Sequence, residues 1–145
     1  MLSSKIKINR IIDANINRAK EGLRVCEEIT RFILENYKLT SELKQLRHKI
    51  SELKQKLPSD TDLIKERDSD KDIGKNITMN ELKRKDLKDI FFANMQRVKE
   101  AIRVLEEFSK LIDTRLSVEF KKSRYRAYEI EKKVAERLSS LLNHR

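Results

Sequence analysis

The chain has 145 residues, of which 40% are charged and 38% are apolar, a balance that excludes general disorder and suits one domain with a modest core. It contains two glycines and one proline, too few for the turns of a many-stranded sheet, so the composition predicts an all-helical protein. The net charge of +10 favours anionic partners, either nucleic acid or phosphorylated metabolites, and does not choose between them.

Two helices are predicted before the only proline. The first is expected from about residue 9 to residue 37, because apolar residues recur at intervals of three and four: Ile12, Ile16, Ala19, Leu23, Cys26 and Ile33. The second is expected to begin at Thr40 or Ser41, which are good N-caps, and to end before Pro58.

The segment after Pro58 loses the helical period and predicts a connecting loop. In the stretch DSDKDIG (68–74), the acidic residues have the spacing found at the start of a calcium-binding loop. The glycine, however, comes one position late, and Met79 stands where the closing glutamate is expected. This excludes an EF-hand. Two alternatives remain: a hydrated linker, or a loop in which Asp68 or Asp72 holds Mg²⁺ beside a substrate phosphate.

The second half of the chain predicts a short helical turn and then two more long helices. Thr78 and Glu81 have the spacing of a capping box, and Asp86 offers a second cap. The third long helix is expected to extend to about residue 112. The last helix is expected to begin near Thr114 or Ser117.

The two halves repeat one another. Residues 14–28 (ANINRAKEGLRVCEE) and 93–107 (ANMQRVKEAIRVLEE) are identical at nine of fifteen positions, at an offset of 93 − 14 = 79. The helices that follow match more weakly, as LKQLRHKISEL and FKKSRYRAYEI. We therefore predict a four-helix bundle of two repeated hairpins with pseudo-two-fold symmetry. The single domain, residues 1–145, then comprises repeat one (8–57), a connecting loop (58–78) and repeat two (79–142).

Polar residues interrupt an apolar stripe in the first repeat and recur in the second. Asn15 and Arg18 occupy the stripe, and Asn94 and Arg97 match them. A buried amide or guanidinium is costly unless it is paired. The side chains therefore either pair inside the bundle or converge from both repeats on an anion.

Arginines in the second helix of each repeat also match, Arg47 beside His48 and Arg124 beside Tyr125. His48 alone is more simply interpreted as a solvated residue than as a metal ligand. Further round the first helices, six charged residues are expected to form a solvated face: Lys20, Arg24, Glu27, Lys99, Arg103 and Glu106.

Several common sites are absent from the sequence. It contains no GxxxxGK[ST], GxGxxG, HExxH or CxxC motif. Any phosphate binding must therefore use arginine, lysine and helix N-termini. The single Cys26 excludes an internal disulfide and is expected to be a packed thiol. No apolar run approaches the roughly 20 residues of a membrane span and no secretory signal is present, so a soluble cytoplasmic protein without a membrane role is expected.

Five blocks occur in a fixed order: RIIDANINRAKEGLRVCEEITRFIL, LRHKI, RDSDKDIG, FFANMQRVKEAIRVLEEFSKL and SRYRAYEIEK. Together they resemble a helical domain found ahead of thiamine-phosphate synthase in some bacteria, over roughly residues 8–135. That family has been proposed as an alternative kinase for hydroxymethylpyrimidine phosphate. The resemblance implies thiamine biosynthesis, with ATP as co-substrate, Mg²⁺ as cofactor and thiamine-phosphate synthase as a partner. The sequence does not include the synthase barrel, so we do not expect synthase activity from it.

We favour an enzyme, a phosphotransferase acting on a small phosphate ester. Asp68 and Asp72 are the expected catalytic and Mg²⁺-binding residues. The expected phosphate-binding residues are Asn15, Arg18, Arg47, Arg67, Asn94, Arg97 and Arg124. One alternative is a regulatory or docking bundle for a thiamine enzyme. The other is a basic nucleic-acid-binding protein, which is less favoured because glutamates interrupt the basic residues of every helix and no binding motif is present.

Overall fold

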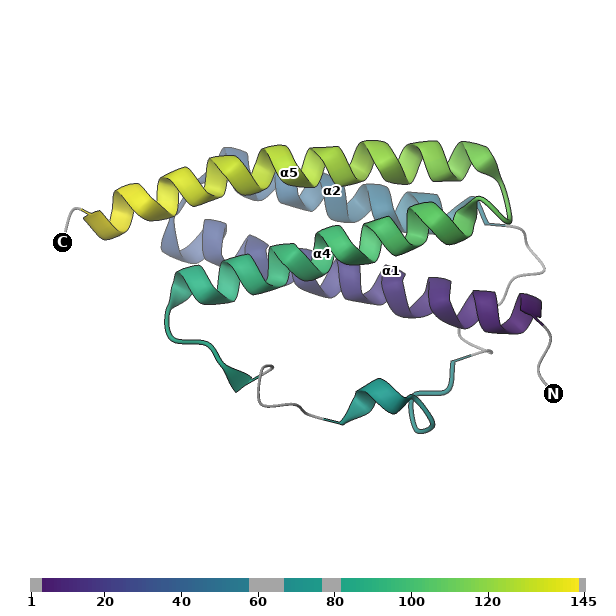
Figure 1. Cartoon of the computed structure of the whole chain (residues 1–145). Helices are drawn as coiled ribbons and strands as arrows, with labels where there is room; N and C mark the ends of the chain where they lie inside the picture. Colours follow the sequence, from purple (N-terminus) through teal and green to yellow (C-terminus); the bar gives the residue numbers. More distant parts are fainter. Residues whose placement is uncertain (1–3, 58–66, 77–81, 144–145) are drawn as a thin grey trace.

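The structure is a computed structural model that describes residues 4–57, 67–76 and 82–143. These segments are helical and contain no strand (Figure 1), which confirms the all-helical prediction. The long helices are α1 (Ser4–Glu28), α2 (Tyr37–Gln55), α4 (Leu87–Ser109) and α5 (Thr114–Asn143). Two short elements accompany them, the π-helix η1 (Ile29–Ile33) and the 3₁₀ turn η2 (Ile73–Lys75). Among the helices of the described segments, none is both long enough and apolar enough to cross a membrane.

The four long helices lie side by side, and each packs against two neighbours. α1 lies between α2 and α4, and α5 covers the opposite side, also between α2 and α4 (Figure 1). One apolar core fills the space between them, with both halves contributing fully buried side chains such as Ile16, Leu43, Phe91 and Ile130. Between α2 and α4, the described residues 67–76 lie on the outside of the bundle (Figure 1).

Helix α1 packs tightly against helix α4 at Gly22. A Cβ atom at this position would lie 2.7 Å from Cγ2 of Val98 and 3.0 Å from the backbone oxygen of Asn94. Glycine therefore permits this close approach, whereas its repeat partner Ala101 carries a methyl group. The low surface at Gly22 shapes the groove between these two helices.

The junction of α1 and α2 differs from the prediction. Backbone hydrogen bonding changes to the π pattern at Ile29, Glu35 adopts a positive φ of 49°, and α2 begins three residues before Thr40. Asn36 caps α2, because its side-chain oxygen accepts a hydrogen bond of 2.9 Å from the backbone N–H of Leu39. The hydroxyl of Thr40 instead donates to the backbone oxygen of Asn36, 2.8 Å away.

In the second half, the predicted helix starts are confirmed. The side chain of Asp86 accepts a hydrogen bond of 2.9 Å from Asp89 N and caps α4, and α5 begins at Thr114. Helix α4 ends at Ser109, slightly earlier than expected, where the backbone closes a tight turn. Pro58 and the predicted capping box of Thr78 and Glu81 lie outside the described residues.

Candidate functional site

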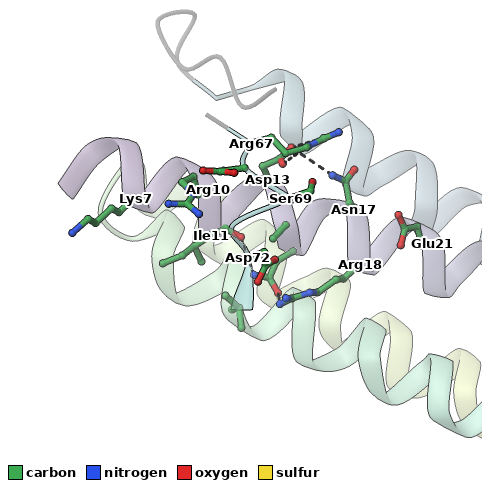
Figure 2. Close-up of a pocket in the computed structure, with 14 residues that line it drawn as sticks. Lys7, Arg10, Ile11, Asp13, Asn17, Arg18, Glu21, Arg67, Ser69 and Asp72 are labelled. Atoms are coloured by element: carbon green, nitrogen blue, oxygen red, sulfur yellow. Dashed lines mark hydrogen bonds and ion pairs between the residues drawn. The ribbon is translucent and has the colours of Figure 1, made fainter. Parts of the chain in front are cut away.

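A cavity of about 730 Å³ lies between α1 and the segment that connects α2 to α4 (Figure 2). We call it the α1–segment cavity. It brings together five of the residues that the sequence singled out: Asn15, Arg18, Arg67, Asp68 and Asp72. The helix supplies the first two and the connecting segment supplies the other three. Arg18 extends from α1 toward the part of the segment that carries Asp72 (Figure 2).

An ion pair anchors the connecting segment to α1. The Nε and Nη2 atoms of Arg67 lie 2.8 and 2.9 Å from the two carboxylate oxygens of Asp13. The Asp13 side chain is only 6% exposed, and its hydrogen bonds raise the pKa of Arg67 above the usual range. The exposed Arg67 thus anchors the segment through a buried carboxylate. The phosphate contact predicted for Arg67 stays a prediction.

Two aspartates of the segment face the cavity with part of their hydrogen-bonding capacity unused. Asp68 accepts a bond of 3.2 Å from the backbone N–H of Lys71, and Asp72 accepts one of 2.8 Å from Gly74. Each bond uses Oδ1, and within the described segments Oδ2 of either residue has no partner. In each aspartate, one carboxylate oxygen therefore closes a turn of the segment, and the other oxygen is available to a ligand.

The same aspartates fit Mg²⁺ only together with a phosphate. Among the described residues, no three acidic, histidine or cysteine side chains are grouped as a metal site. Mg²⁺ usually binds one or two carboxylates and completes its shell with water and substrate phosphates. Asp68 and Asp72 supply that number of carboxylates, so the predicted Mg²⁺ ligands suit a metal that arrives with its substrate.

Three cations of α1 line the cavity without a carboxylate partner. Lys7 and Arg10 make no hydrogen bond or ion pair within the described segments. Arg18 makes one long hydrogen bond, 3.4 Å, to the side-chain oxygen of Asn15. Asn15 in turn donates to the backbone oxygen of Ile11 at 2.8 Å, which fixes the amide. Three cations with no carboxylate partner within the described segments therefore line the cavity.

The charges around the cavity balance without any ligand. Once Arg67 and Asp13 are paired, the lining contains three further cations and three further carboxylates, which are Glu21, Asp68 and Asp72. A bare anion would meet repulsion from the carboxylates as well as attraction from the cations. A phosphate group with a divalent cation satisfies both sets, because the cations bind phosphate oxygens and the carboxylates bind the metal.

The predicted phosphate ligands Arg47 and Arg124 lie elsewhere, in internal ion pairs. Arg47 binds both carboxylate oxygens of Glu27, at 2.6 and 3.1 Å, and Arg124 lies 2.9 Å from Glu106. Hydrogen bonding to these glutamates raises the pKa of both arginines. The expectation that Glu27 and Glu106 are solvated is wrong: both are buried, and an arginine of the following helix neutralises each.

The other two predicted ligands, Asn94 and Arg97, line a second cavity of about 240 Å³ between α1 and α4. Arg18 lines this cavity as well as the first. The predicted four-residue site is therefore divided between two cavities, with Arg18 common to both. Arg97 is exposed and has no hydrogen bond or ion pair within the described segments.

Several residues of the α1–segment cavity were not predicted, among them Lys7, Arg10 and Asp13. The repeat gave no signal for them, because the matched positions of the second half (7 + 79, 10 + 79 and 13 + 79) carry Asp86, Asp89 and Phe92. Asp13 directly follows the core residue Ile12 and precedes the core residue Ile16. An acidic residue in such an apolar stretch could have indicated a buried ion pair.

Comparison with known proteins places the chain in a family. The model of the ThiD2 family matches residues 10–133, a range that includes α2, α4, most of α1 and α5, and the anchor between Arg67 and Asp13. The chain belongs to the ThiD2 family.

The curated relatives of this ThiD2 chain are longer proteins named thiamine-phosphate synthase. The chain is 45% identical over 130 residues to one from Synechocystis sp., covering 89% of this chain and 36% of that protein. The corresponding protein of Nostoc punctiforme is 40% identical over 138 residues, with 94% and 36% covered. That of Rhodopirellula baltica is 39% identical over 131 residues, with 87% and 35% covered. The chain thus spans about a third of their length and has a thiamine-biosynthesis context. No solved structure matches it.

Proposed function

We propose that the domain binds hydroxymethylpyrimidine phosphate in the α1–segment cavity and phosphorylates it with ATP. The observation that carries this proposal is that one cavity is lined by cations of α1 and by two aspartates of the segment. Within the described segments, those cations have no carboxylate partner, and each aspartate has one carboxylate oxygen without a hydrogen bond. The family and the names of the relatives supply the thiamine context. The cations select a phosphate ester, and the aspartates select the metal that accompanies it.

In this mechanism, Arg10 and Arg18 bind the phosphate of the pyrimidine substrate and neutralise its charge. An oxygen of that phosphate attacks the γ-phosphorus of ATP. The bond from the γ-phosphorus to its bridging oxygen breaks, and ADP leaves with the electron pair. The attacking oxygen is already ionised, so no general base is required. Mg²⁺ held by Asp68 and Asp72 supplies further charge neutralisation when it is bound. The protein contributes by positioning and electrostatic stabilisation.

A coupled assay of ADP release, with hydroxymethylpyrimidine phosphate and ATP, tests the proposal. We expect Arg10→Gln to lower kcat/KM by at least tenfold, because a charged hydrogen bond contributes about 1.5–3 kcal/mol. Arg137 of α5 is also unpaired within the described segments and lies outside both cavities, so Arg137→Gln is the matched control. Absence of pyrimidine-dependent ADP release in the wild type would refute the kinase.

The aspartates give a second, independent test. Asp72→Asn keeps an oxygen that can accept the Gly74 N–H bond but removes the charge. We expect this variant to lose most of its turnover at limiting Mg²⁺ while its melting temperature stays unchanged, because the residue is exposed. If Asp68→Asn and Asp72→Asn, singly and together, keep full activity, the segment only connects the two halves.

We also propose that the bundle consists of two related hairpins with an approximate two-fold axis between α1 and α4. Matched positions make matched contacts: Asn15 and Asn94 each donate to the backbone oxygen four residues earlier, both at 2.8 Å. The ion pairs of Arg47 and Arg124 are matched in the same way. Superposition of residues 10–53 on residues 89–130 should therefore align both helix pairs.

A further inference from the structure

The cavity between α1 and α4, which we call the α1–α4 cavity, contains two arginines from matched positions of the repeat. Its lining consists of Arg18, Glu21, Gly22, Val25, Asn94 and Arg97. Arg18 and Glu21 also line the α1–segment cavity, so the two cavities adjoin at one turn of α1. A ligand group in either cavity therefore lies next to Arg18.

Arg97 has no structural partner that explains its position. Arg47, Arg103 and Arg124 all pair with glutamates, whereas Arg97 is exposed and unpaired within the described segments. The repeat places an arginine here twice, as Arg18 and Arg97. An arginine that stabilised the bundle would be expected to bind a carboxylate, as the other three do.

The rest of the lining suits the phosphate chain of a nucleotide. Gly22 lines the cavity together with both arginines. It brings no side chain to a place where an added Cβ would lie 3.0 Å from the backbone oxygen of Asn94. Asn94 has one N–H bound to Ile90 O at 2.8 Å, and its second N–H and its oxygen have no partner in the described segments. Arg18 and Arg97 outweigh the single carboxylate of Glu21, which leaves a net positive charge.

We propose that the α1–α4 cavity binds the phosphate chain of the nucleoside triphosphate donor, with Arg97 and Arg18 as its cations. The inference rests on the proposed function and assigns the second substrate to its own subsite. A volume of about 240 Å³ is below the roughly 300–1,000 Å³ of sites that enclose a whole drug-sized ligand. The cavity therefore holds phosphates, and the nucleoside lies outside it.

Arg18 then has a defined role as the residue shared by both subsites. Transfer requires the attacking oxygen and the γ-phosphorus to approach to roughly 3–3.5 Å. A guanidinium group presents several N–H donors in one plane and can bind an oxygen of each phosphate at once. Arg18 thus offsets the repulsion between the two anions where they must meet, while Arg97 binds only the donor and Arg10 only the acceptor.

Isothermal titration calorimetry on the full chain tests this assignment with two probes. The first is the Mg²⁺ complex of a non-hydrolysable ATP analogue, and the second is hydroxymethylpyrimidine phosphate. We expect Arg97→Gln to weaken binding of the nucleotide analogue about ten- to a hundredfold and to change pyrimidine phosphate binding less than twofold. Arg10→Gln should do the reverse, and Arg18→Gln should weaken both. Arg137→Gln is the control, and Arg97→Lys should recover part of the nucleotide affinity.

The outcomes separate this inference from the proposed function. If the wild type binds pyrimidine phosphate and Arg97→Gln leaves nucleotide affinity unchanged, the donor subsite is overturned and the acceptor site stands. If nucleotide binding depends on Arg97 but no pyrimidine phosphate binds, the donor subsite is supported and the proposed substrate is wrong. Melting curves of each variant show whether it is folded, so that lost binding is not mistaken for lost structure.

Discussion

Arginines in this protein have two distinct roles, which can be told apart residue by residue. One group neutralises buried carboxylates: Arg47 with Glu27, Arg124 with Glu106. The other group faces the cavities without a carboxylate, as Arg18 does. A buried carboxylate that loses its partner is strongly destabilising, whereas an exposed arginine can be removed at little cost to folding.

This contrast predicts which arginine variants unfold the bundle. Arg47→Ala and Arg124→Ala should each lower the free energy of unfolding by about 3 kcal/mol, because a buried glutamate loses its less exposed partner and keeps only the exposed Arg24 or Arg103. Arg18→Ala and Arg97→Ala should change it by less than about 1 kcal/mol and act on ligand binding instead. Urea unfolding measures all four variants. An equally large loss for Arg18→Ala would show that it is a structural residue.

Glu42 predicts how the stability of the bundle depends on pH. Its Oε1 accepts hydrogen bonds from Arg126 at 2.8 Å and Lys133 at 3.1 Å, and so links α2 to α5. Burial raises the pKa of Glu42, but the hydrogen bonds from Lys133 and Arg126 outweigh it and hold the pKa below the ordinary 4.5. A carboxylate with a lowered pKa stabilises the fold above the pKa of the unfolded chain, and this contribution is lost as the pH falls through the folded value.

We therefore expect Glu42→Gln to be less stable than the wild type at pH 7, by about 1–3 kcal/mol, and the difference to shrink below about pH 4.5. Urea unfolding of both proteins from pH 7 to pH 3 measures this. Glu52 is an exposed glutamate on the same helix, so Glu52→Gln is a suitable control. A difference between wild type and Glu42→Gln that stays constant with pH would contradict the role of the charge.

At the scale of elements, the packing of α1 against α4 depends on the absence of a side chain at position 22. Gly22→Ala would gain about 1 kcal/mol of helix propensity. It would also place a methyl group 2.7 Å from Val98, a buried β-branched residue that cannot move aside, and 3.0 Å from the backbone of Asn94. Overpacking of this kind costs about 1–3 kcal/mol and forces the helices apart.

Gly22→Ala is therefore expected to lower the melting temperature despite the better helix former. Thermal unfolding measures the effect, and a double-mutant cycle identifies its cause. Val98→Ala removes the nearest contact, so the two substitutions together should destabilise less than the sum of the single changes. Strict additivity would mean that the contact between position 22 and Val98 is not the source of the loss.

The elements also show what the sequence could predict and what it could not. Apolar spacing predicted the long helices, and Asp86 predicted the start of α4, because both signals are local. The junction of α1 and α2 was missed, since Phe32 and Ile33 continue the apolar pattern although both are exposed. The chain turns there through the left-handed conformation of Glu35, a position where glycine is the usual sign.

The candidate site was predictable only in part, for a related reason. The repeat singled out Asn15 and Arg18, and the composition of the segment singled out Asp72. That these residues share one cavity follows from where the segment lies, which depends on the pairing of Asp13 with a residue 54 positions away. Such long-range contacts leave no periodic trace in a sequence. Glu27 and Arg47 recur in the second half of the sequence as Glu106 and Arg124. This recurrence could have identified both ion pairs.

In the molecule as a whole, one segment without a repeat partner is added to a helical bundle whose sequence repeats. The connecting segment has no counterpart within either repeat, and its described residues 67–76 contribute to a cavity with α1. Arg18 lines both cavities, and the segment is what makes the α1–segment cavity different from the α1–α4 cavity. The pair of Arg67 and Asp13 is therefore the contact on which this difference depends.

Breaking that contact should affect the bundle and the segment in ways that can be separated. Arg67→Gln leaves the Asp13 carboxylate buried with only a 3.5 Å hydrogen bond from Asn17, and we expect a loss of about 1–3 kcal/mol in stability. Adding Asp13→Asn removes the buried charge, so the double variant should recover most of the stability.

The segment remains released in both variants, because neither can form the ion pair. Hydrogen exchange of the amides of residues 67–76 should therefore be faster in both than in the wild type, and pyrimidine phosphate affinity should fall about tenfold in both as Asp68 and Asp72 lose their positions. A double variant that is stable, exchanges rapidly in the segment and still binds pyrimidine phosphate as tightly as the wild type would show that the segment takes no part in the site.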